Sequence, residues 1–452
     1  MKRFKSNRAI RLLLVILAIA SAQGLLLLLL NLTPKQGIGP NIHIHGLQKS
    51  VPACSTKGSR QKVDTFVIHY GPVTESTITE IHKHHLVVLY PHFSITRDIV
   101  AKIQNGRDVD DPSDNVIALG YISIGEDVRT IGKSVDELLS DDRFTGDGSG
   151  PRVDPRGPRG TGGSFSTLTL EHDSLIGFPS PSSNGTRFAS FYLDDNSLVN
   201  TRNATDGIPD RNQNFGGAFT NMGDIAWYDV LQNMTLDGKD HTAGIREILT
   251  LSFGRGLGFD GLFLDTVDTA APNHFTDKFD ENQSEFEWTA MGYLKMLQRL
   301  SSNYPDSILM QNRGVFFFDN RFPHFSLGVG RYIDFLLIES FRLDSNQQHL
   351  YNSANFDDNR FNYAPKIMAE ASRVDFQVLS LGYAEGPPDM MTEETLVGKS
   401  LLGYDELIKV SFFQSFWFKN LMIHSFFLQG HSSRTLVWIP ALSYQRQCFS
   451  GK

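Results

Sequence analysis

The sequence contains few cysteines and no recognisable nucleotide-binding motif. Two cysteines in 452 residues, Cys54 and Cys448, are too few for a disulfide framework or a cysteine-based zinc site and could form at most one bond. No phosphate loop and no Gly-x-Gly-x-x-Gly follows a first apolar run, and no internal repeat is visible. With 40% apolar and 20% charged residues, the chain can bury a large core, which excludes a disordered or collagen-like protein.

Positive charge is scarce outside the N-terminus. Acidic residues outnumber basic ones by 50 to 42, which gives a net charge of -8. Five of the basic residues lie within residues 1–33, which contain no acidic residue, so the remaining chain carries a net charge of -13. An acidic surface disfavours nucleic acid as a partner and attracts cationic ligands, although acidity that only maintains solubility is equally compatible with this composition.

The N-terminus carries an apolar run over residues 12–32, which follows the basic residues. Its length matches the roughly 20 apolar residues of a membrane-spanning helix. A secretory signal peptide is the alternative, because Ala20, Ser21 and Ala22 resemble a cleavage site. In both interpretations the basic flank stays in the cytosol and the rest of the chain is exported, so a membrane is contacted through this segment alone.

Five Asn-x-Ser/Thr sites support export, because they accept glycans in organisms that glycosylate. The acceptors are Asn31, Asn184, Asn203, Asn233 and Asn282. We therefore predict an extracellular or secretory-pathway protein, either secreted or held as a type II membrane protein. The predicted organisation is a signal peptide or signal anchor over 1–33, a linker over 34–63, one large domain over 64–440 and a tail over 441–452.

Eight short apolar runs alternate with polar or helical segments after the linker. They cover residues 65–70, 86–90, 116–125, 188–194, 259–265, 308–312, 335–339 and 377–383. Near-continuous apolar runs are typical of parallel strands that are covered on both faces, and the helical pattern over 285–304 is one expected crossover. Eight such units predict an α/β protein with a (β/α)8 barrel and long loop insertions, and an open doubly wound sheet is the alternative.

Polar residues follow these apolar runs with unusual frequency. In chain order they are His69 and Tyr70, Tyr90 and His92, Glu126, Asp194 and Asp195, Asp265 and Asp268, Asn312, Glu339, and Tyr383 and Glu385. In a barrel enzyme the reacting groups project from the carboxyl ends of the strands. A cleft lined by acids and aromatic rings suits a sugar, and two carboxylates can hydrolyse a glycosidic bond. Any single acid at such a position could instead cap a helix or pair with a cation.

Four strings of residues together resemble a known family. They are GYISIGE (120–126), GFDGLFLDTVD (258–268), QNRG (311–314) and FLLIES (335–340). In these strings the chain resembles the endo-α-1,4-polygalactosaminidases, glycoside hydrolase family 114, over roughly residues 64–440. The resemblance implies a (β/α)8 barrel that cleaves partly deacetylated polymers of α-1,4-linked galactosamine or N-acetylgalactosamine. An acidic cleft for such a cationic polysaccharide fits the charge of the chain, and no cofactor or metal is implied.

The resemblance assigns Asp265 and Glu339 as the catalytic pair. Our hypothesis is that Asp265 is the nucleophile or a stabilising carboxylate, and that Glu339 is the general acid, with a pKa raised by its apolar strand neighbours. A carboxyl separation of about 5 to 5.5 Å would predict retention of configuration and one of about 6.5 to 9.5 Å inversion. We predict that the substrate-binding residues are Tyr70, Tyr90, Tyr121, Glu126, Asp194, Asp268, Asn312 and Tyr383.

Three alternatives remain open from the sequence. A metal-dependent amidohydrolase could use His43 and His45 or the cluster at 82–85, but the later apolar runs end in acids and an amide instead of histidines. Residues 194–196 and 205–210 could hold calcium, although their spacing is wrong for an EF-hand and a metal-free turn is favoured. A barrel that binds carbohydrate without cleaving it is the third alternative.

Overall fold

The computed structural model describes the central part of the chain. The described residues are 63–153, 180–181, 187–194, 206–212, 215–272, 286–339, 341, 358–385, 407–411 and 439–440. The predicted export segment, nearly all of the linker, the tail, both cysteines, His43, His45, Asp195 and four of the five glycosylation acceptors lie outside them. Within the described ranges, no helix combines the length and the apolar character that crossing a membrane requires.

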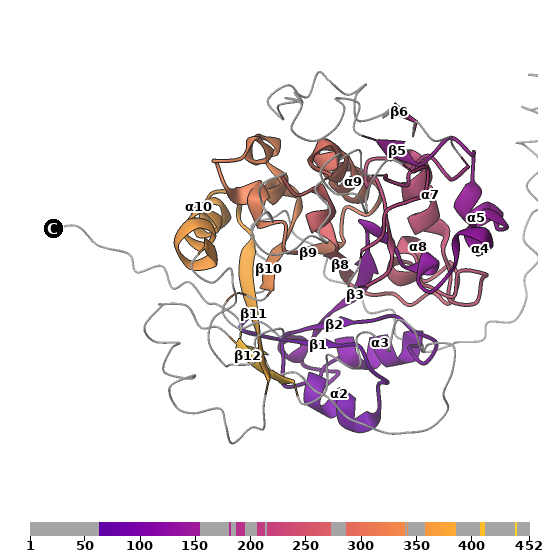
Figure 1. The fold of residues 1–452 in the computed structure, drawn as a ribbon. Helices are drawn as coiled ribbons and strands as arrows, with labels where there is room; N and C mark the ends of the chain where they lie inside the picture. Colours follow the sequence, from indigo (N-terminus) through magenta and orange to yellow (C-terminus); the bar gives the residue numbers. More distant parts are fainter. Residues whose placement is uncertain are drawn as a thin grey trace, which may run out of the picture. The chain divides into compact units, whose positions relative to one another are not determined.

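A parallel sheet forms the centre of the fold (Figure 1). Its strands are β1 (Thr65–His69), β2 (Leu86–Leu89), β3 (Ile117–Ser123), β8 (Gly261–Asp265), β9 (Ile308–Asn312), β10 (Phe335–Glu339), β11 (Gln377–Glu385) and β12 (Leu407–Ser411). They pair in chain order, and β13 (Ile439–Pro440) adds an antiparallel strand beside β1. The order of hydrogen-bonded neighbours does not return on itself among the described strands, so they form a curled, half-barrel arrangement.

Seven of the eight predicted strands are confirmed as members of this sheet, and the fourth, over 188–194, is wrong. That segment makes isolated bridges to Gly150, Arg152 and Thr220, and β3 pairs directly with β8. Its backbone N–H groups bond to residues outside the parallel sheet: Asp194 N donates to Arg152 O, and Leu193 N donates to Phe219 O. A buried segment beside the sheet therefore has the same apolar pattern as a strand within it.

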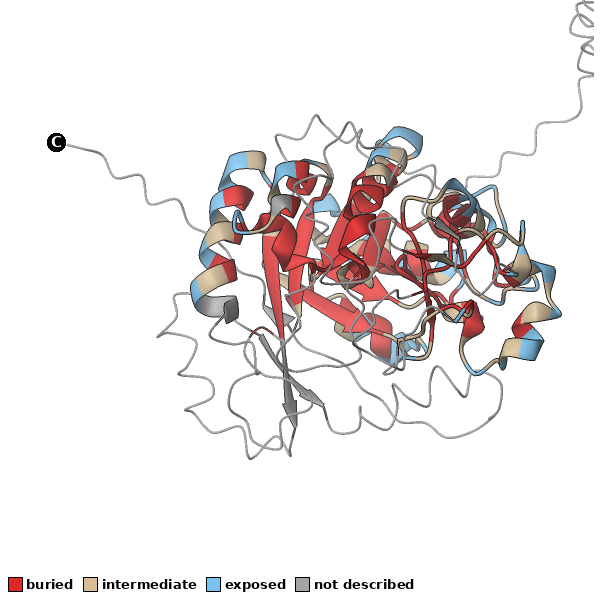
Figure 2. Cartoon of the chain, turned by 45° about the horizontal axis from the view of Figure 1, so that its top comes forward, coloured by how far each residue is buried: buried red, intermediate tan, exposed pale blue. Residues whose placement is uncertain are grey.

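Helices cover the sheet and turn their polar faces to solvent (Figure 2). The α-helices are α2 (Glu75–Ile81), α3 (Arg97–Gln104), α4 (Val135–Leu139), α5 (Asp142–Thr145), α7 (Ile225–Asn233), α8 (Ile245–Leu249), α9 (Ala290–Asn303) and α10 (Ala364–Val374). The pattern predicted over 285–304 is confirmed by α9, whose residues Met291, Leu294, Leu297 and Leu300 are buried at helical spacing. Threonine side chains cap α2 and α3, where Thr74 and Thr96 accept from backbone N–H groups in the first turn.

The segment between β3 and β8 forms a separate wall beside the sheet. It contains the short pair β4 (Glu126–Asp127) with β7 (Ala218–Phe219) and the short pair β5 (Arg152–Val153) with β6 (Ser180–Pro181). Trp227 of α7 is buried and its indole Nε1 donates to the carbonyl of Ile124, 2.7 Å away. This contact holds α7 against the loop that follows β3.

Aspartates that immediately precede strands align neighbouring strands. Asp260, before β8, exchanges hydrogen bonds with Ala118 of β3, through its backbone N–H and through its carboxylate. Asp334, before β10, does the same with Leu309 of β9, where each of the two bonds is 2.8 Å long. In each of the two strand pairs, a carboxylate takes the place of a backbone acceptor where the strands begin. These contacts help to fix the strand register, which in turn positions the residues at the carboxyl ends of the strands.

Replacing Asp334 with alanine should destabilise the fold. The substitution lies at the start of β10, away from the residues that end the strands. The buried N–H of Leu309 would lose its acceptor, which costs about 1–3 kcal/mol in free energy of unfolding. Urea denaturation of Asp334→Ala, with Asp334→Asn as the variant that keeps one acceptor, measures the effect. The control is Asp306→Ala, an exposed residue in the turn before β9. Equal stability of Asp334→Ala and Asp306→Ala would contradict the alignment role.

Candidate active site

Two carboxylates from different strands meet at one amide group. Asn312, the last residue of β9, donates from Nδ2 to Asp265 Oδ1 at 2.9 Å and to Glu339 Oε2 at 2.6 Å. Asp265 ends β8 and Glu339 ends β10, so three adjacent parallel strands supply the three groups. Because both oxygens bond to one nitrogen, they can be no farther apart than the sum of these two distances, 5.5 Å.

Asn312 is oriented by the charges around it. Its side chain is buried, and its Oδ1 has no hydrogen-bond partner among the described residues. A flipped amide would point that oxygen at two carboxylates and would lose both charge-assisted hydrogen bonds. The two acids therefore fix the amide, and the amide in turn holds the two acids close together.

Three tyrosines lie beside the carboxylates: Tyr70 and Tyr90 directly follow β1 and β2, and Tyr121 lies within β3. Ring centroids are 5.4 Å apart for Tyr70 and Tyr121, 5.5 Å for Tyr90 and Tyr121, and 6.3 Å for Tyr70 and Tyr90. The Tyr121 hydroxyl donates to Asp265 Oδ2 at 2.7 Å. Burial, and after it the charges of Asp265 and Glu339, raise the pKa of Tyr70 well above its usual value, so this hydroxyl stays protonated. Burial and Asp265 likewise raise the pKa of Tyr121.

Glu126 is a third acid near this site, and its environment favours the neutral form. The side chain is buried, and burial, with a smaller contribution from Asp265, raises its pKa to about 8. Asn212 Nδ2 donates to Glu126 Oε1 at 2.5 Å, which partly offsets the shift. At neutral pH the predicted third-strand acid is therefore mostly a protonated, hydrogen-bonding carboxyl group.

Asp268 supports the loops that follow β8 and β9. Its carboxylate accepts from Arg313 Nε at 2.6 Å and from the backbone N–H of Gly314 at 2.9 Å. Arg313, Gly314 and Thr266 all have positive φ angles, between 56° and 64°, a conformation that costs energy in a non-glycine residue. Thr266 Oγ1 also accepts from the N–H of Gly125 at 2.7 Å, which joins the β8 loop to the β3 loop.

Two of the predicted substrate-binding residues, Asp194 and Tyr383, are not seen beside the carboxylate pair. Asp194 is fully buried in the segment outside the sheet, where its Oδ2 accepts from the N–H of Gly207 at 3.0 Å. Tyr383 lies in β11, but its side chain is outside the described part of the structure. The structure thus brings together Tyr70, Tyr90, Tyr121, Glu126, Asp265, Asn312 and Glu339, and it places Asp268 one loop away.

Residues that contact the site but were not predicted include Asn212, Thr266 and Arg313. Arg313 stands inside the QNRG string and directly after Asn312, so the motif itself contained the signal. Nothing in the local sequence marks Asn212, because its partner Glu126 is 86 residues away. As for the predicted metal alternatives, no group of three or more histidine, cysteine, aspartate or glutamate side chains with metal-binding geometry occurs in the described ranges.

The fold and these residues define an α/β protein with a two-carboxylate site at the carboxyl edge of a parallel sheet. No family model and no curated protein matches the sequence. Among solved structures, the glycoside hydrolase domain of PelA from Pseudomonas aeruginosa is similar, with 14% identity, 77% of this chain and 95% of that domain covered, and a TM-score of 0.43. Amy13B from Eubacterium rectale follows at 9% identity, with 68% and 52% covered and a TM-score of 0.29. Because these TM-scores are below 0.5, the similarities do not indicate a function, and the function is inferred from the site.

Glu126 should make the stability of the fold depend on pH. Its pKa is about 8 in the folded protein and near the usual 4.5 when unfolded, so between these values the folded state holds the extra proton. The free energy of unfolding should therefore fall as the pH rises from about 5 to about 8. Urea denaturation across this range should show a flatter slope for Glu126→Gln, because glutamine does not titrate.

The control for this slope is Glu137→Gln. Hydrogen bonds from Ser134 lower the pKa of the exposed Glu137, so it does not titrate in this range. That variant should lose stability by a constant amount and keep the wild-type slope. Identical slopes in wild type and Glu126→Gln would show that Glu126 is ionised in the folded protein across the range.

Proposed function

We propose that this protein is a glycoside hydrolase in which Asp265 and Glu339 are the two catalytic carboxylates. The observation that carries the proposal is the single amide nitrogen of Asn312 shared between them. Glycosidases use a pair of acids on either side of the scissile bond, held at a set separation. The position of the pair at the carboxyl ends of β8 and β10 is also where barrel-type enzymes carry their reacting groups.

The separation favours a retaining mechanism. The upper limit of 5.5 Å on the distance between the two carboxylate oxygens is compatible with the roughly 5–5.5 Å spacing of retaining enzymes and is shorter than the roughly 6.5–9.5 Å that inverting enzymes need for a water. Asp265 accepts a hydrogen bond on each oxygen, from Tyr121 and from Asn312, and is thereby oriented for attack. We therefore assign Asp265 as the nucleophile and Glu339 as the acid.

The reaction then proceeds in two displacements. Asp265 forms a bond to the anomeric carbon while the bond from that carbon to the glycosidic oxygen breaks, and Glu339 gives its proton to the departing oxygen. Water then attacks the anomeric carbon, returns a proton to Glu339 and releases Asp265. Tyr70 and Tyr121 stay protonated beside the reacting centre, where the Tyr121 hydroxyl donates to Asp265 Oδ2.

The proposed substrate is a polysaccharide of α-1,4-linked galactosamine and N-acetylgalactosamine. Support comes from the family resemblance of the four sequence strings and from the net charge of -13 outside residues 1–33, which attracts a cationic polymer. A secreted or membrane-anchored location belongs to the same proposal. Asn233, the one glycosylation acceptor within the described residues, is exposed at the end of α7, as a glycan requires.

Loss of either acid should slow hydrolysis strongly. Glu339→Gln and Asp265→Asn should each lower kcat by about 10²–10⁴-fold, the usual contribution of a positioned acid or base. The assay follows soluble oligosaccharides released from partly deacetylated galactosaminogalactan by mass spectrometry. Asp375→Asn is the matched control, because this exposed aspartate has a positive φ angle that asparagine also tolerates. Wild-type turnover by Glu339→Gln would remove the assignment, and polymer binding without any products from wild type would indicate a carbohydrate-binding protein.

The stereochemistry of the first product tests the spacing argument separately. A retaining enzyme acting on α-linkages should release the α-anomer first, and mutarotation should follow. Proton NMR spectra recorded during the first minutes of hydrolysis distinguish the two anomers. Initial release of the β-anomer would establish inversion, and Asp265 would then have to act as a base on water.

A further inference from the structure

Two of the three strands that carry the carboxylate pair and its amide are followed by a residue in a left-handed backbone conformation. Thr266, directly after Asp265, has a φ of 64°, and Arg313, directly after Asn312, has a φ of 56°. Only four non-glycine residues in the described ranges have a positive φ, so half of them occupy these two positions. The conformation is unfavourable for a residue with a Cβ atom and persists where surrounding contacts enforce it. The contacts around these two turns therefore bear on the positions of Asp265 and Asn312.

The turn after β9 is enforced by polar side chains. Gln311 is fully buried and donates from Nε2 to Arg313 O at 2.7 Å, while its Oε1 accepts from the buried Tyr293 hydroxyl, also at 2.7 Å. Asp268 accepts from Arg313 Nε at 2.6 Å and from the N–H of Gly314 at 2.9 Å. The carbonyl and the side chain of Arg313 and the N–H of Gly314 thus each have a partner.

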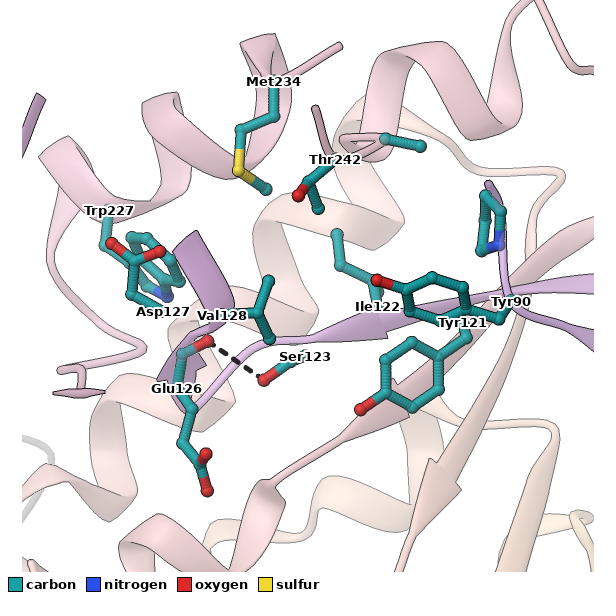
Figure 3. A pocket seen from close by; sticks show the side chains of 12 residues that line it. Tyr90, Tyr121, Ile122, Ser123, Glu126, Asp127, Val128, Trp227, Met234 and Thr242 are labelled. Atoms are coloured by element: carbon teal, nitrogen blue, oxygen red, sulfur yellow. Dashed lines mark hydrogen bonds between the residues drawn. The ribbon is translucent and has the colours of Figure 1, made fainter. Parts of the chain in front are cut away.

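The turn after β8 is bonded to the loop that follows β3. Thr266 Oγ1 accepts from the N–H of Gly125 at 2.7 Å and lies within hydrogen-bond distance, 3.0 Å, of Ser123 Oγ. Figure 3 shows the next contact of that loop, where Ser123 Oγ donates to Glu126 O at 3.0 Å. Gly125 packs so closely that a Cβ atom there would lie 2.2 Å from Thr266 O. The turn after Asp265 is therefore anchored to the end of β3 independently of β9.

Asp268 connects the two turns. It lies in a short 3₁₀ helix (Val267–Ala270) that begins directly after Thr266, and its carboxylate bonds across to the turn after Asn312. Its bond to the Arg313 guanidinium is charge-assisted and therefore stronger than a bond between neutral groups. The side chains of Asp268 and Arg313 are 23% and 30% exposed, so the pair is partly shielded from water.

A displacement of the turn after β9 would reach the carboxylate pair through Asn312. Its Nδ2 bonds to Asp265 and to Glu339, so a rotation of Asn312 changes both contact distances at once. Arg313 is its direct neighbour in the chain, and the N–H of Arg313 donates to Leu337 O of β10 at 2.9 Å. Catalysis is sensitive to such changes, since a misplacement of about 1 Å can cost about 10²-fold in rate. The left-handed turn at Arg313 therefore contributes to the spacing of the proposed nucleophile and acid.

We propose that Asp268 is a positioning residue for the reaction, an inference that rests on the proposed glycoside hydrolase function. By holding Arg313 in its left-handed conformation and joining the turns after β8 and β9, it fixes the orientation of Asn312 and hence the separation of the two carboxylates. Asp268 acts through these residues and does not contact the sugar, in contrast to the substrate contact that the family resemblance suggests for it. The chemical step therefore depends on Asp268, whereas substrate affinity does not.

The first test separates kcat from KM in Asp268→Ala, with the full chain acting on partly deacetylated galactosaminogalactan. We expect kcat to fall by about 10–100-fold and KM to change by less than about 2-fold, because a positioning defect affects the transition state and not ground-state binding. Asp268→Asn keeps an acceptor for the N–H of Gly314 but loses the charge that pairs with Arg313, so its kcat should lie between those of wild type and Asp268→Ala. A raised KM with an unchanged kcat would show that Asp268 contacts substrate and would overturn the proposal.

Asp114→Ala is the matched control. Asp114 also accepts from an arginine side chain and from a backbone N–H, both of Arg107, at 2.8 and 2.6 Å, but it precedes β3 and so lies at the amino end of the strands. This variant should keep the wild-type kcat, with circular dichroism used to verify that each variant is folded. Equal losses of kcat in Asp114→Ala and Asp268→Ala would contradict a positioning role.

The Asn312 side-chain amide provides a readout that does not need turnover. In the full chain with isotope-labelled asparagines, its Nδ2 resonance is the NMR signal missing from Asn312→Asp, and it reports the bonds to the two carboxylates. Asp268→Ala should shift this resonance and Asp114→Ala should not, so an unchanged resonance in Asp268→Ala would also overturn the proposal. If the resonance shifts but wild type releases no products, Asp268 still positions the site and the hydrolase proposal fails.

Discussion

The site depends on one amide nitrogen that is shared by two carboxylates, and the register of three parallel strands makes this sharing possible. Asn312 is paired with Leu337 of β10, and its neighbour Gln311 is paired with Leu264 of β8. Side chains of paired residues in a parallel sheet point to the same face, and every second residue returns to that face. Asp265, Asn312 and Glu339 must therefore project together. A shift of one residue in either pairing would turn a carboxylate to the opposite face.

Much of this arrangement could be predicted from the sequence, because local patterns carry it. Apolar runs bounded by polar residues located seven strands, and the acids and the amide that end three of them are the groups that meet. The segment 188–194 was misjudged for a physical reason: burial produces an apolar run whether the segment pairs within the sheet or packs beside it. Contacts between distant residues, such as Asn212 with Glu126, have no local pattern and required the structure.

The net negative charge around the carboxylate pair is smaller than the number of acidic residues there suggests. Of the acids near the ends of β3 and β8, Asp127 is paired with Arg129, Asp268 is paired with Arg313, and Glu126 is mostly protonated at neutral pH. The negative charge of these three acids is thus largely offset. The surroundings of the pair near the ends of β3 and β8 are therefore less acidic than the sequence suggests.

Because the wall between β3 and β8 is not part of the sheet, its sequence is not constrained by strand pairing, as a strand of a closed barrel would be. Where the predicted fourth strand would have contributed both to the sheet and to the cleft, β3 pairs directly with β8 and the intervening segment only packs alongside. Trp227, Met234 and Ala243 lie on that segment, whereas Asp265, Asn312 and Glu339 lie on the sheet. Substitutions and insertions in the wall can therefore accumulate over evolutionary time while the strand register, and with it the geometry of Asp265, Asn312 and Glu339, is inherited unchanged.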